Sequence, residues 1–524
     1  MQKDCLLGVD LGTTLAKAGV YDTQGNLLGE AYQETEISYP RPGVAEQDPH
    51  EFYRSAVSTI RGALEGSRVG SGRIAALSLS SQAGGIMAID RSWQPVTPFD
   101  SPLDTRSNAK KQRMMAAAGS RIVELAGAPP TYGQKILWWK EEHPEVWKRV
   151  YKFIQPAAYV AGLLAGATGE QAFMEPSFMG WSGLSDSANR RWSEELCGLL
   201  DVPLDVLPRV APAYEIVGHL TVAAARDTGL PSGLPIAAGA ADAAASLLGA
   251  GVVEPGVLFD VAGTACIFGV CLDQYRADSA TQTLSCMSSV LPGIFYQLAI
   301  VLGGRTHDWF VREFCREEAS EAAPKGLSVY ACMDAKAEGL PPGSEGVLCL
   351  PQLGGRWNPA EPDVRGLWIG FGWGHRKEHL YRAILESVAY EYAIYLARMR
   401  ELFPQASFPE VRVMSGGGRS RLWNQIKCDV LGIPYRKLAR TDLTTWGSGL
   451  IAGHAVGIFP DLAIAAKTCA PAGDRQEPDP VAHQAYRSYT ALYPRLFETN
   501  RQTFSALANL AAHPAPHGDG KDNA

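Results

Sequence analysis

The sequence predicts an α/β protein built from two similar halves, and three observations lead to this fold class. Short apolar runs that end in turn residues alternate with longer stretches of helical periodicity, as is typical of strands and helices that share a core. The chain has 524 residues, enough for two large domains or three ordinary ones. An Asp, Gly, Thr core at the end of an apolar run occurs twice, as Asp10-Leu-Gly-Thr-Thr14 and as Asp260-Val-Ala-Gly-Thr-Ala265.

The opening residues predict strands followed by a helix. Residues 6–10 form an apolar run, and residues 16–21 and 27–32 flank a turn-rich joint that is typical of a β-hairpin. A helix is predicted over residues 49–64, because Asp48 suits the N-cap and Pro49 suits the first helical position.

Later segments continue the alternation of strands and helices. Strands are predicted over residues 73–79, 86–90, 257–261, 266–271 and 411–414, and a mainly helical region over residues 107–164. The tail over residues 506–524 is expected to be disordered, because its end is rich in Pro, His, Gly and Asp and has no periodicity.

Composition and charge exclude several classes of partner. Hydrophobic residues make up 46% and charged residues 20%, as in an average globular protein, and the net charge is −7. We expect no nucleic-acid partner, because proteins that bind nucleic acid usually present a basic face. The apolar stretch 236–253 carries Asp242 at its middle, which argues against a membrane span.

Cysteine usage and the first residues favour a cytoplasmic protein. The ten cysteines contain no CxxC pair, so neither a cysteine-based zinc site nor a thiol redox motif is indicated. Free thiols at this density fit a reducing compartment. The N-terminus has acid and glycine where a signal peptide needs an apolar region.

The first Gly-Thr turn is a candidate phosphate site. Gly12, Thr13 and Thr14 follow a strand and offer backbone N–H groups and hydroxyls, which suit phosphate oxygens. Asp10 could hold Mg²⁺ directly or through water, because Mg²⁺ prefers one or two carboxylates together with phosphate. The alternative is an ordinary hairpin turn with a capping aspartate.

A second candidate is the glycine run Gly416-Gly-Gly418, which follows a strand and is expected to open a helix. Consecutive glycines let the backbone approach a ligand closely, and a helix N-terminus favours anions. The segment is neither a Walker A loop nor a complete GxGxxG motif. A nucleotide site and a flexible turn are both consistent with it.

Asp242 stands alone among Ala and Gly residues, and burial there would raise its pKa towards that of a general base. The alternative is a helix N-cap carboxylate. Gln82, Asp104 and Arg106 occupy strand-end or loop positions and could equally be solvated surface residues. His307 has no His or Cys at metal spacing and is interpreted as structural or polar.

The ordered set of motifs resembles the FGGY family of carbohydrate kinases, over the chain to about residue 460. The matching pieces are Gly8 to Lys17, Glu46-Gln-Asp-Pro49, Asp104-Thr-Arg106, Gly239-Ala-Ala-Asp242, Gly263-Thr264, Arg365 to Phe371 continuing to Glu386, and Gly416 to Gly418 with Trp423 and Gln425. The resemblance implies two RNase H-like (actin/hexokinase-type) domains with an interdomain ATP cleft. The N-terminal domain would span residues 1–248 and the C-terminal, nucleotide-binding domain residues 249–505.

The resemblance also implies the reaction, in which the γ-phosphoryl group of Mg²⁺-ATP passes in line to a hydroxyl of a small sugar (a ketose) or polyol. ATP and Mg²⁺ are the implied cofactors. The implied site residues are Asp242 as catalytic base; Gly12, Thr13, Thr14, Lys17, Gly263 and Thr264 at the ATP phosphates; Gly416, Gly417, Gly418 and Gln425 at adenosine; Gln82, Ala83, Gly84, Asp104, Arg106 and Asp242 at the acceptor; and Asp10 at the metal.

The departures from the family pattern concern the acceptor. Xylulose kinases typically show Gly-Gln-Met-His and glycerol kinases Asn-Gln-Arg-Glu where this chain has Ser81-Gln-Ala-Gly84. The family's tryptophan segment is replaced by Ser101-Pro-Leu103, and Glu175-Pro-Ser177 stands at its middle Asp-x-Ser element. These changes argue against both glycerol and ordinary D-xylulose, while a ketose or polyol is kept.

Other functions are compatible with the same motifs. A kinase for a larger or modified sugar is one, and a non-catalytic nucleotide- and sugar-binding regulatory protein on the same fold is another. A chaperone-type ATPase would need a peptide-binding domain, for which the remaining tail is too short. The oligomeric state stays open, with a homodimer as one expectation.

Overall fold

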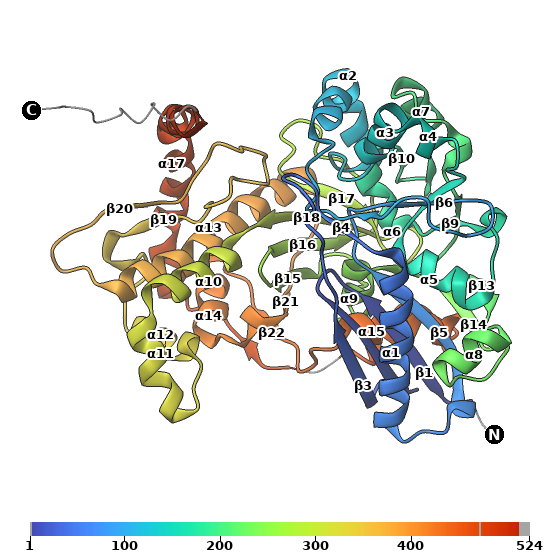
Figure 1. Cartoon of the computed structure of the whole chain (residues 1–524). Coiled ribbons are helices and arrows are strands. Elements are labelled where there is room, and N and C mark those ends of the chain that lie inside the picture. The colour runs from blue at the N-terminus through green and yellow to red at the C-terminus, as the bar shows by residue number, and fades with distance from the viewer. Residues whose placement is uncertain (1–2, 471–472, 513–524) are drawn as a thin grey trace, which may run out of the picture. The chain divides into compact units, whose positions relative to one another are not determined.

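The computed structural model describes residues 3–470 and 473–512 (Figure 1). The chain divides into two compact units. The first contains the residues up to Leu258 together with Gly269–Leu298 and Leu438–Gly473, and the second contains Phe259–Phe268, Ala299–Lys437 and the residues from Asp474. Two later segments belong to the first unit, so these units are not continuous in sequence, and the division into domains over residues 1–248 and 249–505 stays a prediction.

The first unit is built on a six-stranded sheet with the order β13-β14-β5-β1-β2-β3. Its strands are β1 Cys5–Leu11, β2 Leu15–Asp22, β3 Leu27–Glu34, β5 Ile74–Ser81, β13 Ile216–His219 and β14 Pro235–Ala241. Strands β1, β2 and β3 form the antiparallel arrangement that the hairpin pattern predicts. Strand β5 runs parallel to both β1 and β14, so these three strands end at the same edge of the sheet.

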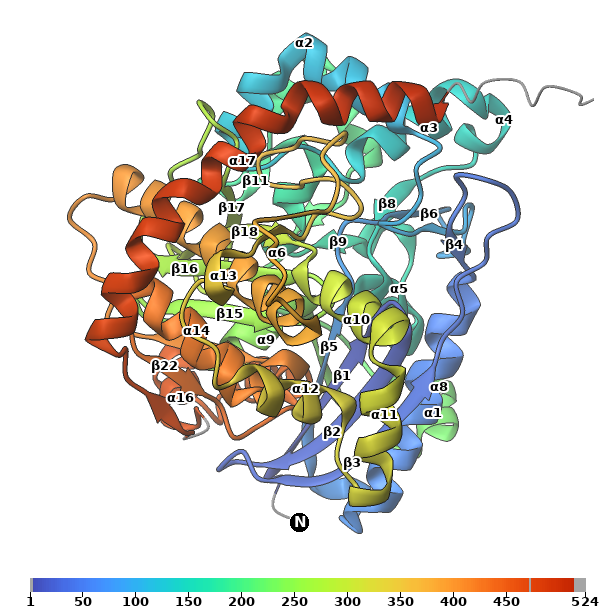
Figure 2. The same ribbon diagram turned by 90° about the vertical axis from the view of Figure 1, so that its left-hand side faces the viewer.

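Helices cover both faces of this sheet. Helix α1 (Pro49–Ser67) begins as predicted, with the Asp48 side chain accepting a hydrogen bond from the His50 N–H. It packs on β2 and β3 beside α5 (Pro156–Ala165), while α9 (Asp242–Gly249) and α15 (Leu443–Ala455) lie on the opposite face (Figures 1 and 2). A Cβ at Gly8 would lie 1.8 Å from the Thr445 carbonyl oxygen, so β1 and α15 touch through their backbones.

The remaining elements of the first unit are short or lie beyond the sheet. Its other helices are α2 Asn108–Ala126, α3 Gly133–Glu142, α4 Pro144–Trp147, α6 Pro176–Met179, α7 Glu194–Leu199, α8 Val222–Thr228 and α16 Leu462–Thr468. Its short strands are β4 Glu46–Gln47, β6 Met87–Ile89, β7 Phe99–Asp100, β8 Lys152–Ile154, β9 Phe173–Met174, β10 Ser185–Asp186, β11 Arg191–Trp192 and β12 Arg209–Val210.

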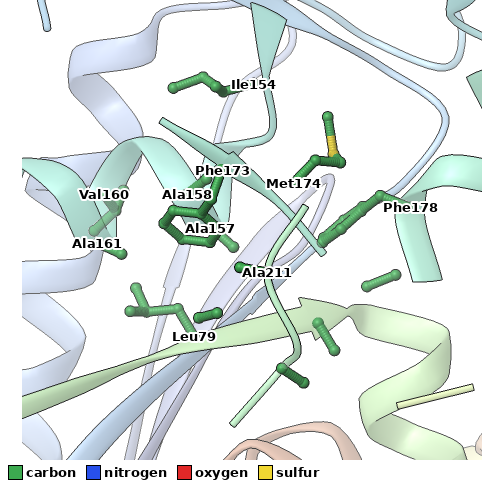
Figure 3. Close-up of a cluster of buried hydrophobic side chains, with 14 of the residues drawn as sticks. Leu79, Ile154, Ala157, Ala158, Val160, Ala161, Phe173, Met174, Phe178 and Ala211 are labelled. Atoms are coloured by element: carbon green, nitrogen blue, oxygen red, sulfur yellow. The ribbon is translucent and has the colours of Figure 1, made fainter. Parts of the chain in front are cut away.

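Part of the first unit's core anchors the segment around β9. Figure 3 shows Phe173 beside Leu79 of β5 and the alanines of α5, and Met174 and Phe178 belong to the same buried cluster. All of these side chains are buried. Burying a Phe or Met side chain stabilises a fold by about 1.5–3 kcal/mol, so the segment over residues 173–178 is held firmly against the sheet.

The second sheet repeats the strand order of the first. Its order is β17-β18-β16-β15-β21-β22-β23, with β17 Ser285–Ser288, β18 Phe295–Val301, β16 Cys266–Leu272, β15 Leu258–Ala262, β21 Val411–Met414, β22 Tyr435–Lys437 and β23 Arg475–Gln476. Read from β23 to β18, the order matches β13-β14-β5-β1-β2-β3, and the first strand of each series is antiparallel to its neighbour. This confirms the α/β class and the two similar halves.

The helices of the second unit pack around α13 (Lys377–Leu402). They include α10 Gly303–Phe314, α11 Arg316–Ala322, α12 Val329–Ala337, α14 Arg421–Leu431 and α17 Pro480–Ala512. The expected disorder of the tail is wrong for residues 506–512, which continue α17, and residues 513–524 lie outside the described part of the chain. Within residues 3–470 and 473–512, no helix has both the length and the apolar character to cross a membrane.

Replacing Gly239 by alanine is expected to lower the free energy of unfolding by about 2–5 kcal/mol, because two costs add. Gly239 has φ +79°, and a Cβ there would lie 1.7 Å from the Leu79 carbonyl oxygen. Gly229→Ala is the matched control, since Gly229 has φ +77° with open space around it and should lose only about 1 kcal/mol. Urea unfolding of both variants measures the difference, and equal losses would refute the steric argument.

Candidate active site

Two aspartates face one edge of the first sheet. In the paired register Leu11 and Ala241 both lie beside Ser81, so the residues that follow the three parallel strands emerge together. Asp10 is the second-last residue of its strand, and Asp242 follows β14 as the first residue of α9. The sheet therefore brings the predicted metal residue and the predicted base to one edge.

The Asp10 carboxylate is buried, and its Oδ1 accepts a hydrogen bond of 3.0 Å from the Ser80 hydroxyl. Burial, together with the negative charge of Asp242, raises the pKa of Asp10 to about 7. The Ser80 hydrogen bond and the positive charge of Lys17 act in the opposite direction. Two carboxylates that repel one another in this way attract a cation.

The Asp242 carboxylate is partly exposed, and its Oδ1 accepts a hydrogen bond of 2.7 Å from the Ala243 N–H. Desolvation raises the pKa of Asp242 to about 6. At neutral pH the group is therefore ionised, yet basic enough to accept a proton from a hydroxyl during a reaction.

The first Gly-Thr turn closes the β1–β2 hairpin, with the Gly12 N–H donating to the Leu15 carbonyl over 3.2 Å. Thr14 is exposed at its tip. Lys17 is also exposed, on the strand position that pairs with Asp10. The turn thus presents a hydroxyl and an ammonium group at the same edge as the two aspartates.

A glutamine pair connects this turn to the next strand end. The Thr13 hydroxyl donates to Gln82 Oε1 over 3.0 Å, and Gln82 Nε2 donates to Gln47 Oε1 over 2.7 Å. Gln47 in turn donates to the Thr13 carbonyl over 3.1 Å. Gln82 is a predicted site residue, whereas Gln47 belongs to the Glu46 to Pro49 motif, for which the sequence predicts no role in the site.

Arg106 lies in a cluster of carboxylates in the first unit. Its guanidinium contacts Asp104 at 2.7 Å, Glu46 at 3.0 Å and Asp100 at 3.1 Å. The guanidinium carbon also lies 4.9 Å from the centroid of the Trp138 ring. The positive charge of Arg106 is therefore already matched within the protein.

The two small residues after Gln82 differ in their surroundings. Ala83 is partly exposed, whereas Gly84 is buried with φ +85° and faces Thr131 and Pro102. A Cβ at Gly84 would approach the Thr131 hydroxyl to 3.2 Å, so a larger residue would be strained there.

The second unit contains a cavity of about 570 Å³. Its lining comes from the β15–β16 turn, from α10 and α12, and from the glycine run: Ala262, Gly263, Thr264, Gly304, His307, Asp308, Ser328, Tyr330, Ala331, Asp334, Gly416, Gly417, Arg419, Ser420 and Trp423. We call this cavity the second-unit pocket. It brings together the predicted residues Gly263, Thr264, Gly416 and Gly417.

The N-terminus of α10 lies against the second Gly-Thr turn. The Arg305 N–H donates to the Thr264 carbonyl over 3.0 Å, and a Cβ at Gly304 would lie 1.9 Å from the Gly263 carbonyl oxygen. A helix N-terminus carries positive partial charge, so this end of the pocket suits an anion such as a phosphate group.

Two predicted adenosine residues do not line the pocket. Gly418 packs on Val413. The Gln425 amide donates to Asp429 over 2.8 Å and to the Glu477 carbonyl over 3.0 Å. The glycine run itself forms a 3₁₀ turn over Gly416–Arg419, and α14 begins only at Arg421, with Ser420 as its N-cap.

The sequence interpretation missed several residues of the pocket. His307 is buried, and its Nε2 has no hydrogen-bond partner among the described residues. Burial lowers the pKa of His307 to about 4, so its ring is neutral. Asp334 accepts hydrogen bonds of 2.7 Å from Tyr381 and from Ser420. Only their approach in space reveals these residues, since no motif contains them.

The oxygen donors at the first edge fit Mg²⁺. Among the described residues, no group of three or more His, Cys, Asp or Glu side chains is placed to hold a metal ion by itself. Asp10 and Asp242 supply hard carboxylate oxygens and no nitrogen or sulfur donors. Mg²⁺ suits such a site, because it is usually held by one or two carboxylates together with substrate phosphates.

Comparison with known proteins covers both units. Residues 5–249 match the N-terminal domain model, and residues 259–456 the C-terminal domain model, of the FGGY family of carbohydrate kinases. A xylulose kinase of Staphylococcus epidermidis is 24% identical over 97% of this chain and 100% of its own length, and a gluconokinase of Bacillus subtilis is 28% identical over 81% and 82%. The crystal structure of a xylulose kinase from Rhodospirillum rubrum superposes with a TM-score of 0.84 at 25% identity, covering 96% of this chain and all of that one.

Proposed function

Because the chain belongs to the FGGY family of carbohydrate kinases, we propose that it uses the shared edge of β1, β5 and β14 to phosphorylate a small neutral ketose or polyol. The protein is a two-domain α/β phosphotransferase that phosphorylates a sugar or polyol with ATP. The comparisons offer no support for the non-catalytic alternative. The observation that carries the finer proposal is the convergence of Asp10, Gln82 and Asp242 at one sheet edge.

Asp242 is the proposed general base. Its raised pKa of about 6 leaves it ionised at neutral pH and able to accept the proton of the attacking hydroxyl. Phosphoryl transfer depends mainly on positioning and on charge neutralisation, so a fixed base at a rigid strand end suits the reaction.

The second-unit pocket is the proposed ATP site. Gly263 and Thr264, beside the N-terminus of α10, would bind the phosphates, and Gly416 and Gly417 would lie at the nucleoside. In the first unit, the turn over Gly12 to Thr14 and the Lys17 ammonium would bind the transferred phosphoryl group. The Gln425 amide is bonded to Asp429 and to the Glu477 carbonyl, so Gln425 is not among the proposed nucleoside-binding residues.

Asp10 is the proposed Mg²⁺ residue. Its buried carboxylate accepts a hydrogen bond from Ser80, and its pKa is raised by burial and by the charge of Asp242. Such a carboxylate suits a site that binds a cation together with the substrate. Bound Mg²⁺ would neutralise charge on the phosphate oxygens. The protein holds Asp10 in place for this role, because β1 is hydrogen-bonded to β5 along its length.

The charge around Arg106 supports a neutral acceptor. Three carboxylates already match this guanidinium, so it offers no free positive charge to a sugar acid. Gln82, Asp104 and Arg106 are the proposed hydroxyl-binding groups. The partly exposed Ala83 leaves more room than the larger residue that xylulose and glycerol kinases have at this position. The free thiols and the use of ATP support a cytoplasmic location.

The test is ADP release by the purified protein with Mg²⁺-ATP across tetruloses, pentuloses, hexuloses, alditols and aldonates. At least one neutral acceptor is expected to raise ADP release well above the acceptor-free rate, and aldonates should stay near that rate. An aldonate as the best acceptor would overturn the charge argument. No response to any neutral acceptor, with ATP binding intact, would overturn the proposed acceptor class.

A further inference from the structure

A network of hydrogen bonds joins a buried glutamate to the Ala241 N–H, one residue before Asp242. We propose that Glu175 and Ser177 are positioning residues, which hold the junction of β14 and α9 so that Asp242 meets the acceptor hydroxyl at a fixed place. This inference rests on the proposed role of Asp242 as the base.

The donor and acceptor of each hydrogen bond in this network follow from which atoms carry hydrogen. The Ala241 N–H donates to Ser177 Oγ over 2.9 Å, and the Ser177 hydroxyl donates to Glu175 Oε2. Glu175 Oε2 also accepts the Ser177 N–H over 2.8 Å. Because the carboxylate takes the hydroxyl hydrogen, the serine oxygen is left to accept the amide, and each group has one assigned role.

Glu175, at one end of this hydrogen-bond network, is fixed in the hydrophobic core. Glu175 is 1% exposed and caps α6. It directly follows Met174 and precedes Phe178 in the sequence, and both of these side chains belong to the buried cluster of Figure 3. The preceding strand β9 pairs with β12 through Phe173 and Arg209. Because the Glu175 carboxylate is held by the hydrophobic cluster, its hydrogen bonds restrict the position of the Ser177 side chain.

Burying Glu175 is costly, which argues for a role beyond packing. Its Oε1 has no hydrogen-bond partner among the described residues, and burial raises the pKa of Glu175 to about 7. The nearby charge of Arg190 opposes that rise. An apolar residue at position 175 would avoid this cost but would leave the Ser177 hydroxyl without its acceptor.

Ala241, at the other end of the hydrogen-bond network, directly precedes Asp242 in the sequence. Ala241 is the N-cap of α9, and no side chain caps this helix. The hydrogen bond to Ser177 therefore fixes the Ala240–Ala241 peptide, one residue before Asp242, at the point where α9 begins. A displacement of about 1 Å at a reacting group can cost about 10²-fold in rate.

Ser177→Ala tests the proposal by removing the link while leaving the core side chains in place. With the acceptor found in the panel, kcat is expected to fall about 10–100-fold. The KM for ATP should stay within about twofold, because every residue of the second-unit pocket is unchanged. Glu175→Gln keeps an oxygen acceptor for the hydroxyl and should lose far less kcat than Ser177→Ala.

Ser182→Ala is the matched control. Ser182 is also buried, accepts the Leu184 N–H over 2.9 Å and donates to the Met179 carbonyl over 2.6 Å, but it has no bond to Ala241. It should lose a similar amount of stability and keep its kcat. If Ser182→Ala and Ser177→Ala lose equal kcat, Ser177 has only a structural role and the proposal fails.

Hydrogen exchange supplies a readout that needs no activity. Amides in peptides covering residues 235–247 should exchange faster in Ser177→Ala than in wild type or Ser182→Ala, and unchanged exchange would overturn the link.

Failure of the proposed base role of Asp242 can be distinguished from failure of the positioning role of Ser177. If Asp242→Asn is as active as wild type, the base assignment fails; if that variant is inactive but Ser177→Ala keeps full kcat, only the positioning role fails.

Discussion

Replacing Asp242 by asparagine is expected to lower kcat by about 10²–10⁴-fold, the usual contribution of a positioned general base. Asparagine has nearly the same shape but cannot take up the hydroxyl proton. Because the pKa of Asp242 is raised to about 6, wild-type kcat should fall as the pH drops below about 6, where the carboxyl becomes protonated and the base is lost. Initial rates of ADP release between pH 5 and 8 measure both effects.

The control for Asp242→Asn is Asp227→Asn, which makes the same chemical change on the surface of the first unit. Asp227 accepts a hydrogen bond of 2.8 Å from Tyr53 and lies on α8, away from the three strand ends. Its kcat should stay within about twofold of wild type, since surface changes of this kind are usually small. If Asp242→Asn retained more than a tenth of wild-type kcat, Asp242 would not be the base.

Local patterns predict the strand ends and turns of the site well. The Asp48 cap and Pro49 place the start of α1, and the Gly-Thr repeat corresponds to two sheets with one strand order. These features depend on neighbouring residues and on backbone geometry, which a single sequence displays directly.

The second-unit pocket shows where local patterns stop being sufficient. Trp423 lines it and Gln425 does not, because residues two apart on a helix point in different directions. His307 and Asp334 reach the pocket from α10 and α12, far from the glycine run in sequence. Only the packing of these segments reveals that they meet.

The two aspartates of the internal repeat illustrate a subtler difference. Asp10 stands two residues before Gly12, whereas Asp260 stands three residues before Gly263. Since side chains alternate along a strand, this one-residue offset turns Asp260 to the other face of its sheet. There it is buried with Lys427, while Asp10 faces Asp242. The two copies of the repeat therefore share the Gly-Thr turn, but Asp10 and Asp260 lie on different faces of their sheets and have different surroundings.

Replacing Lys427 by methionine is expected to lower the free energy of unfolding by about 3–5 kcal/mol, the usual cost of removing one partner of a buried ion pair. The Lys427 ammonium contacts Asp260 Oδ2, and neither side chain is exposed. Tyr392 donates to Asp260 Oδ1 over 2.7 Å, but a single hydrogen bond cannot replace a full positive charge. Urea unfolding at neutral pH measures the loss.

Two further variants separate the buried charge from simple packing. The double variant Lys427→Met with Asp260→Asn should recover part of the loss, because no uncompensated carboxylate then remains in the core. Lys467→Met, which breaks the exposed pair with Glu254, should cost less than about 1 kcal/mol. If Lys427→Met cost no more than Lys467→Met, Asp260 would have to be stabilised by Tyr392 alone.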